Sequence, residues 1–488
     1  QAANKTIGQG GFQEVEQMNL FKDMVCYQEE VRDPSRMAEV LNRVIEKAIR
    51  GSAPAQINVP RDYWTQVIDI ELPTIIRMER NSGGAQAVKS AAELLSSAKF
   101  PIILSGAGVI LADAIDDCKA LAEKLDAPVA CGYQHNDSFP GSHPLAIGPL
   151  GYNGSKAAME IISKADVVLA LGTRLNPFST LPGYGIDYWP KQASIIQVDI
   201  NSDRIGLAKK VTVGICGDAK LVAQQILEQL SSSAGDDGRE ERRALIHQTK
   251  SAWLQTLTSL NHEEDDPGTT WNKDSRERDP ERMSPRVAWR AIQAGIPQDA
   301  IISSDIGNNC AIGNAYPTFE KGRKYLAPGL FGPCGYGFPS ILGAKIGCPN
   351  TPVIGFAGDG AFGISMSEMT SCNRKEWPNI TMVIFRNYQW GAEKRNSILW
   401  YDNNFVGTEL DPDLSYAKIA EACGSKGVEV KTPSELTEAI KTSCVEQQKG
   451  ITTFIEVILN QELGEPFRRD AMKKPVHVAG INSADMQN

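Results

Sequence analysis

A glycine-rich turn after one buried strand, together with a polar residue after the next strand, constrains this chain most. A Gly-Asp-Gly turn at 358–360 follows the apolar run at 353–357, and Asn387 follows the apolar run at 381–385 and Arg386. Short runs of this kind are typical of strands buried on both faces of a parallel sheet. Ligands of such sheets gather at the carboxyl ends of the strands. The side chains of residues 359 and 387 are therefore predicted to point at one ligand from neighbouring strand ends.

Magnesium is the cation that this pattern favours. Mg²⁺ prefers about six oxygen ligands and commonly takes several of them from substrate phosphates. Asp359 and Asn387 would supply two oxygens and the backbone carbonyl of Gln389 a third, so that a diphosphate and one water would complete the shell. The glycines at 358 and 360 would let the backbone approach the phosphates, and the helix predicted to begin at Ala361 would offer free N–H groups.

Strand and helix patterns alternate along most of the chain, which predicts an α/β protein with doubly wound parallel sheets. We expect the closing part of a first, incomplete domain at 1–75, a central domain at 85–228 and a third domain at 285–460. A charged, serine-rich connector at 229–284 and a polar tail at 461–488 would account for the rest. The expected strands cover residues 56–59, 101–104, 128–131, 166–171, 194–198, 300–303, 353–356, 381–385, 427–430 and 452–458. The expected helices cover residues 32–50, 112–125, 156–164 and, within the connector, 244–257.

Composition and charge argue against several classes of protein. A length of 488 residues is too long for one core and suits several domains. A net charge of −9 gives no reason to expect nucleic acid or a membrane as a partner. The ten cysteines are scattered singly, without the spacing of a zinc site, which favours a reduced, cytoplasmic protein.

Three longer segments of the chain resemble segments of a known enzyme family. Residues 331–344 (PheGlyProCysGlyTyrGlyPheProSerIleLeuGlyAla) resemble the segment that supports the thiazolium ring in acetolactate-synthase-like enzymes. Residues 139–151 resemble the central domain of those enzymes, and residues 7–14 resemble the late part of their pyrimidine-binding domain. The resemblance implies three domains of the thiamine-diphosphate enzyme superfamily, the first one incomplete here, with thiamine diphosphate and Mg²⁺ as cofactors.

Departures from acetolactate synthases indicate the subfamily. This chain has Cys334 where those enzymes usually carry Met, and Arg386 where they usually carry Asn. The blocks at 386–396, 405–410 and 460–475 are similar to the sulfoacetaldehyde acetyltransferase family. That resemblance implies an acyltransferase of taurine and sulfonate catabolism, which converts sulfoacetaldehyde and inorganic phosphate to acetyl phosphate and sulfite.

The resemblance also assigns roles to individual residues. The carbonyl of Gly332 would meet the aminopyrimidine, and Cys334 would hold the cofactor in its bent form, although a small core residue is an equally good reading of this cysteine. Gln13 is a further catalytic candidate. The expected cofactor-binding residues are Gly332, Cys334, Gly358, Asp359, Gly360, Ala361, Asn387, Gln389, Trp390 and Asn308. The expected metal ligands are Asp359, Asn387 and Gln389. The candidates for binding the substrate anions are Arg386, Lys394, Arg395 and Arg468, each of which could instead be a solvated surface charge.

The same family activates its cofactor with a glutamate from the early pyrimidine-binding domain. Neither Glu14 nor Glu16 occupies that position, so we expect the activating residue to lie outside this chain, and a protein that truly began at Gln1 to be poorly soluble and inactive. The resemblance further implies a homodimer or homotetramer with the active site at the subunit interface.

Other interpretations remain open at this stage. Acetolactate synthase or another thiamine-diphosphate decarboxylase is the nearest alternative, and a non-catalytic binding subunit of the same fold is another. The segment SerGlyAlaGlyVal at 105–109 contains only two glycines of a dinucleotide fingerprint and is weak evidence for such a ligand. His135 and His143 are more simply explained as structural loop residues than as active-site groups.

Overall fold

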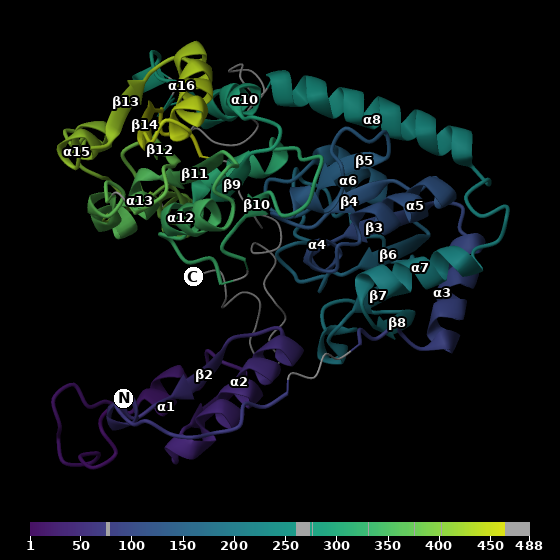
Figure 1. Cartoon of the computed structure of the whole chain (residues 1–488). Coiled ribbons are helices and arrows are strands. Elements are labelled where there is room, and N and C mark those ends of the chain that lie inside the picture. The colour runs from purple at the N-terminus through teal and green to yellow at the C-terminus, as the bar shows by residue number, and fades with distance from the viewer. Residues whose placement is uncertain are drawn as a thin grey trace, which may run out of the picture. The chain divides into compact units, whose positions relative to one another are not determined.

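The computed structural model describes residues 1–74, 79–259, 274–275, 277–329, 331–374, 376–401 and 403–463. The chain divides into two compact units, 1–80 and 81–488 (Figure 1). Each unit is described by itself.

The first unit is a small parallel βαβ arrangement. Strand β1 (Tyr27–Glu30) pairs in parallel with β2 (Ala55–Asn58), and α2 (Met37–Gly51) connects them. Val40 and Val44 of α2 are buried together with Val31 and Tyr63. The predicted helix at 32–50 and strand at 56–59 are confirmed within a few residues. Strand β1 was not predicted because its sequence, TyrGlnGluGlu, lacks an apolar run. The unit also contains α1 (Gln17–Phe21) and two short 3-10 turns, Pro34–Arg36 and Arg61–Tyr63.

The second unit contains two six-stranded sheets, and the strands of each sheet are all parallel. The first sheet has the order β5-β4-β3-β6-β7-β8. Its strands are β3 (Pro101–Ser105), β4 (Val129–Cys131), β5 (Ala146–Pro149), β6 (Val167–Leu171), β7 (Ser194–Asp199) and β8 (Val213–Cys216). Its helices are α3 (Ala85–Ser96), α4 (Ala107–Leu111), α5 (Ile115–Leu125), α6 (Lys156–Ile162) and α7 (Ala219–Gln229).

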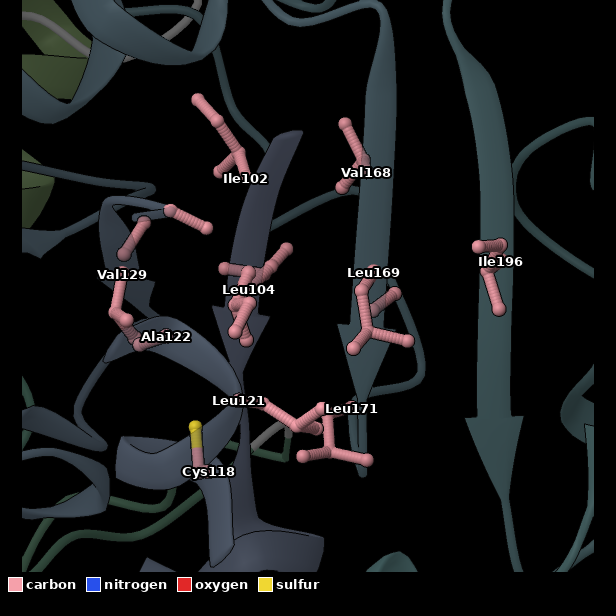
Figure 2. Packing of buried hydrophobic residues seen from close by; sticks show 14 of the residues in the cluster. Ile102, Leu104, Cys118, Leu121, Ala122, Val129, Val168, Leu169, Leu171 and Ile196 are labelled. Atoms are coloured by element: carbon pink, nitrogen blue, oxygen red, sulfur yellow. The ribbon is translucent and has the colours of Figure 1, made fainter. Parts of the chain in front are cut away.

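Burial on both faces explains the apolar character of these strands. All five residues of β3 and of β6 are buried, and Figure 2 shows Leu104 and Leu169 from these strands in one cluster with Leu121 of α5. Continuous apolar runs suit strands that lie between two layers of helices. The predicted doubly wound α/β fold is therefore confirmed.

The second sheet has the order β10-β9-β11-β12-β14-β13. Its strands are β9 (Ile301–Ser304), β10 (Tyr325–Leu326), β11 (Val353–Gly358), β12 (Thr381–Arg386), β13 (Lys426–Val430) and β14 (Thr453–Ile458). Its helices are α10 (Pro285–Gly295), α11 (Asn308–Ile312), α12 (Gly337–Gly347), α13 (Asp359–Ser365), α14 (Gly391–Trp400), α15 (Tyr416–Ala422) and α16 (Pro433–Gln447). Two aromatic-rich clusters cover the sheet: one contains Trp289, Phe356 and Phe385, and the other contains Phe338, Phe362 and Phe454.

The connector carries one long helix, α8 (Arg239–Ser259), which contains the predicted helix at 244–257 and runs beside α6 (Figure 1). Besides β1, the strands β5, β8 and β10 were not predicted; they have two to four residues each, too few for a periodic signal. Several helices, among them α3, α7, α10 and α16, were not predicted individually either. Within the described parts of the chain, no helix is both long and apolar enough to cross a membrane.

Candidate cofactor and metal site

The Gly-Asp-Gly turn and Asn387 lie at the same edge of the second sheet. Strand β11 ends at Gly358 and pairs in parallel with β12, which ends at Arg386, so that Asp359 and Asn387 follow neighbouring strand ends as predicted. A cavity of about 280 Å³ opens there. Its lining includes the predicted residues Asn308, Gly332, Cys334, Gly358, Asp359, Gly360, Ala361, Asn387, Gln389, Trp390 and Arg395.

Asp359 is held firmly at the edge of this cavity. Its side chain is 1% exposed. Its Oδ2 accepts hydrogen bonds from the backbone N–H groups of Asn387 (3.1 Å) and Tyr388 (2.7 Å) and from the guanidinium of Arg386 (3.1 Å), and its Oδ1 accepts from the N–H of Gly360 (3.0 Å). Burial raises the pKa of the Asp359 carboxyl to about 6, although these donors oppose the shift. A buried carboxylate of this kind is stabilised by a further positive charge.

Two buried oxygens beside Asp359 have no hydrogen-bond donor among the described residues. They are Oδ1 of Asn387 and Oε1 of Gln389. The amide nitrogen of Asn387 donates to Oδ1 of Asn309 at 3.4 Å, which turns Oδ1 of Asn387 away from that contact. Leaving a buried acceptor without a partner costs about 1–3 kcal/mol, a penalty that a bound cation would relieve.

The donor set therefore fits a hard cation that is only partly held by protein. No group of three or more His, Cys, Asp or Glu side chains that could hold a metal occurs in the described ranges. One carboxylate, one amide oxygen and a backbone carbonyl leave room for phosphate oxygens and water, as Mg²⁺ requires.

At two glycines that line the cavity, the backbone comes close to neighbouring side chains. A Cβ on Gly360 would lie 2.9 Å from the Trp390 ring, and a Cβ on Gly391 would lie 3.1 Å from Asn308. Helix α14 begins at Gly391, and its first residues line the cavity. Free N–H groups at a helix N-terminus favour a bound phosphate, and these residues therefore fit a diphosphate.

Asp305 is a residue of this site that the sequence did not reveal. It follows β9, is fully buried, and accepts hydrogen bonds from the N–H groups of Gly335 (3.1 Å) and Gly337 (2.7 Å). These bonds fix the loop that carries Gly332 and Cys334, both of which line the cavity. Gly332 and Gly335 have φ of 61° and 86°, which favour glycine over any residue with a side chain. Burial raises the pKa of the half-buried Cys334 thiol.

Replacing Asp305 with asparagine is expected to lower the free energy of unfolding by about 1–3 kcal/mol, because an amide N–H would face a backbone N–H. Loosening the loop should also weaken thiamine diphosphate binding roughly 10–100-fold, as observed when supporting residues of bound groups are lost. Calorimetry of cofactor binding measures the second effect.

The matched control for this variant is Asp137→Asn. Asp137 is equally buried and accepts from the N–H groups of Lys324 (2.9 Å) and Tyr325 (3.2 Å), but it does not line the cavity. Asp137→Asn should lose little stability, because Oδ1 of Asp137 has no hydrogen-bond partner among the described residues and the amide nitrogen can take its place, and only Asp305→Asn should lose cofactor affinity. Equal affinity losses in the two variants would contradict the positioning role.

A second group missed from sequence comes from the loops after β4, β5 and β6. Tyr133, Tyr152 and Phe178 line the same cavity as Asp359 and Asn387. Asn314 holds two of these loops in place: its Oδ1 accepts from the N–H of Gln134 (3.2 Å) and its Nδ2 donates to the carbonyl of Tyr152 (3.1 Å). Only contacts between segments far apart in sequence bring these residues together.

The remaining predicted residues lie elsewhere. Arg386 is 1% exposed and pairs with Asp359 and with Glu456 (3.5 Å), and Lys394 pairs with Glu409; neither basic residue belongs to the cavity lining. Burial lowers the pKa of Lys394. Gln13 lies in the first unit, where it is exposed and has φ of 62°. Arg468 lies outside the described residues.

Comparisons with known proteins agree with this geometry. Residues 88–226 match the model of the thiamine pyrophosphate enzyme central domain, and residues 305–457 match that of the C-terminal thiamine pyrophosphate binding domain. Among solved structures, benzoylformate decarboxylase from Polynucleobacter necessarius shares the fold, with a TM-score of 0.75 at 20% identity over 96% of this chain and 82% of that chain.

Relatives found by sequence define the family more narrowly than the shared fold does. The chain is 77% identical to the probable sulfoacetaldehyde acetyltransferase of Rhizobium meliloti (strain 1021), over 100% of this chain and 82% of that protein. It is 73% identical to the sulfoacetaldehyde acetyltransferase of Roseovarius nubinhibens, over 100% of this chain and 81% of that protein. The chain therefore belongs to the sulfoacetaldehyde acetyltransferase family of thiamine pyrophosphate enzymes.

Proposed function

We propose that this protein converts sulfoacetaldehyde and inorganic phosphate to acetyl phosphate and sulfite. The observation that carries the proposal is the pair Asp359 and Asn387, at neighbouring strand ends beside a cavity, in a chain that is 77% identical throughout to a probable enzyme of that name. A carboxylate buried beside an amide oxygen that lacks a donor is an arrangement suited to a cation, and a cation is what a diphosphate cofactor requires.

The overall reaction balances without an outside oxidant. The aldehyde carbon rises to the oxidation level of a carboxylic acid, while the neighbouring carbon loses its bond to sulfur and gains hydrogen. Sulfite leaves with the electron pair of the broken carbon–sulfur bond, and a phosphate oxygen forms the new bond to the acetyl carbon. When bound, thiamine diphosphate supplies the nucleophilic carbanion and the electron sink that this rearrangement needs.

The residues of the chain would bind and orient the reactants. Asp359, Asn387 and the backbone carbonyl of Gln389 would hold Mg²⁺. The N–H groups at the start of α14, which begins at Gly391, would bind the diphosphate. The loop fixed by Asp305 would present the Gly332 carbonyl and the Cys334 side chain to the rest of the cofactor. Further cofactor contacts are proposed for Asn308, Gly358, Gly360, Ala361 and Trp390.

We also propose that the protein acts in the cytoplasm as a homodimer or homotetramer whose active site lies at the subunit interface. The scattered free cysteines support a reducing compartment. The family resemblance supports the oligomer, and sedimentation of the complete protein would measure its mass.

The complete protein, loaded with thiamine diphosphate and Mg²⁺, is expected to release sulfite from sulfoacetaldehyde and to form an equal amount of acetyl phosphate. Omitting phosphate should abolish acetyl phosphate, and chelating Mg²⁺ should stop sulfite release until the metal is restored. Both products can be measured directly by colorimetric assay. Efficient conversion of pyruvate to acetolactate, with no sulfite from sulfoacetaldehyde, would instead identify an acetolactate synthase.

A further inference from the structure

A second and larger cleft lies between α8 and the edge of the first sheet. Its volume is about 840 Å³, and its walls come from α8, from the segment around the edge strand β5, and from residues Ala315, Pro317 and Thr318. Figure 1 shows α8 running beside α6. In the described part of the chain, no residue that lines the cofactor cavity also lines this cleft. Sites for small molecules typically have volumes of about 300–1,000 Å³, so this cleft could hold a ligand of its own.

Helix α8 contributes a regularly spaced stripe of side chains to the cleft. The stripe consists of Ile246, Lys250, Trp253, Leu254 and Leu257. Spacings of three and four residues place these side chains on one face of the helix. From the first to the last of them the helix extends about 16 Å. Four of the five are apolar, and Leu254 is 65% exposed, so the stripe forms an elongated apolar wall that is partly open to solvent.

Apolar side chains of the first sheet line the same cleft. Phe139, Leu145 and Ile147 belong both to the lining and to the buried core cluster of this sheet. They therefore form a surface that is fixed in place by the packing beneath it. A hydrocarbon that entered the cleft would be removed from water by contact with these residues and with the stripe of α8.

Lys250 places a charge in the middle of the apolar stripe. Its side chain is half-buried, and its ammonium donates one hydrogen bond to the carbonyl of Pro144 (3.2 Å), which also lines the cleft. Burial alone lowers the pKa of Lys250, without a contribution from any neighbouring charge. An ammonium has three N–H donors, and a partly buried charge without a counter-charge is unfavourable. An anion that reached Lys250 would relieve this penalty.

The other strongly charged side chains of the cleft already have partners. Arg243 pairs with Asp126 (2.7 Å), and Glu123 lies 3.3 Å from His143. Among the lysine, arginine and acidic side chains of the described lining, Lys250 is the one without a partner of opposite charge. The cleft thus combines a long apolar surface with one available cation.

We infer that this cleft binds an apolar carboxylate, with the carboxylate on Lys250 and an elongated hydrocarbon body along the stripe of α8. The inference goes beyond the acetyl-transfer reaction and does not depend on it. From Lys250 to Leu257 the helix extends about 10 Å, which suits a chain of medium length such as that of decanoate. The carboxylate would form a charge-assisted hydrogen bond with the ammonium, and the chain would cover the exposed side chain of Leu254.

Calorimetric titration of the complete, cofactor-loaded protein with decanoate tests this inference. We expect one binding site per chain. Lys250→Gln should weaken the binding of decanoate at least about tenfold, because one charge-assisted hydrogen bond is lost. The same variant should leave the binding of decanol unchanged, because decanol has no charge for the ammonium to recognise.

A second variant, Leu254→Glu, tests the apolar wall. Leu254 is largely exposed, so the substitution should leave the fold intact. The new carboxylate would lie against the hydrocarbon chain, and the binding of both decanoate and decanol should weaken at least about tenfold. The two variants therefore separate recognition of the charge from recognition of the chain.

Lys209→Gln is the matched control. Lys209 is also a half-buried lysine whose pKa burial lowers, but it lies over the ring of Trp189 (4.7 Å), outside the cleft. Its loss should leave decanoate affinity unchanged. The inference is overturned if the unaltered protein does not bind decanoate, if either correctly folded cleft variant binds it as tightly as the unaltered protein, or if Lys209→Gln weakens it equally. A protein that binds decanoate as expected but never releases sulfite from sulfoacetaldehyde would overturn the proposed function alone.

Discussion

Replacing Asp359 with alanine is expected to abolish Mg²⁺-dependent binding of thiamine diphosphate, with a loss of affinity of at least about 100-fold. Asp359 is the one carboxylate among the proposed metal ligands, and loss even of a residue that merely supports a ligand typically costs 10–100-fold. The substitution also removes the acceptor that the N–H groups of Asn387 and Tyr388 share, so the neighbouring ligand would lose its fixed position. Calorimetry with thiamine diphosphate, with and without Mg²⁺, measures the effect.

Asp199→Ala provides the control for this variant. Asp199 is another buried aspartate at the carboxyl end of a parallel strand, β7, where it accepts from the N–H of Asn201 (2.9 Å). It lies outside the cavity lining, so its removal should leave cofactor affinity unchanged. Normal Mg²⁺-dependent affinity in the Asp359→Ala protein would exclude Asp359 as a metal ligand.

Replacing Arg386 with methionine is expected to lower the free energy of unfolding by about 3–5 kcal/mol, because it leaves buried carboxylates without their shared counter-charge. The guanidinium of Arg386 pairs with Asp359 at 3.1 Å and with Glu456 at 3.5 Å. It also lies over the ring of Tyr388 and donates to the carbonyls of Asp411 and Leu414. Chemical denaturation of the variant measures the loss.

A double variant and a control at a solvent-exposed ion pair test whether the loss of stability comes from the buried charges. Adding Glu456→Gln to Arg386→Met removes one of the uncompensated charges and should restore part of the lost stability. Arg374→Met, which breaks the exposed pair with Glu376, should change stability little. A loss for Arg386→Met as small as that for Arg374→Met would show that the buried ion pairs contribute nothing to the fold.

The position of Arg386 accounts for one departure from acetolactate synthases. At the end of β12, its side chain reaches Asp359 on the neighbouring strand and Glu456 on β14 at the same time. This charge links the end of β12 to the turn after β11 and to the middle of β14, and it holds Asp359, a residue of the cavity lining. From the sequence, Arg386 was considered only as a candidate for substrate binding, and its ion pairs with Asp359 and Glu456 were not predicted.

Much of the fold could be predicted from local sequence because its strands are buried on both faces. Runs such as 167–171 and 353–357 consist almost entirely of apolar residues, and each forms a strand of a parallel sheet. Strands at or near the margins of the sheets were missed where they are short or polar, as in β10 with two residues and β1 with TyrGlnGluGlu. The apolar pattern weakens wherever one side of a strand is not covered.

The sequence by itself was enough to predict that Asp359 and Asn387 lie at one edge of a sheet, because each follows directly after an apolar strand and parallel strands end at one edge. Only the tertiary structure decided which other groups join them. Asp305 reaches a loop some thirty residues further along the chain, and Tyr133 and Phe178 reach the cavity from a different sheet. Lys394 and Arg395 are neighbours in sequence, yet successive residues of a helix point about 100° apart, so one pairs with Glu409 while the other enters the cavity. Sequence spacing can show which residues follow the ends of strands, whereas the direction of a side chain depends on contacts between distant segments.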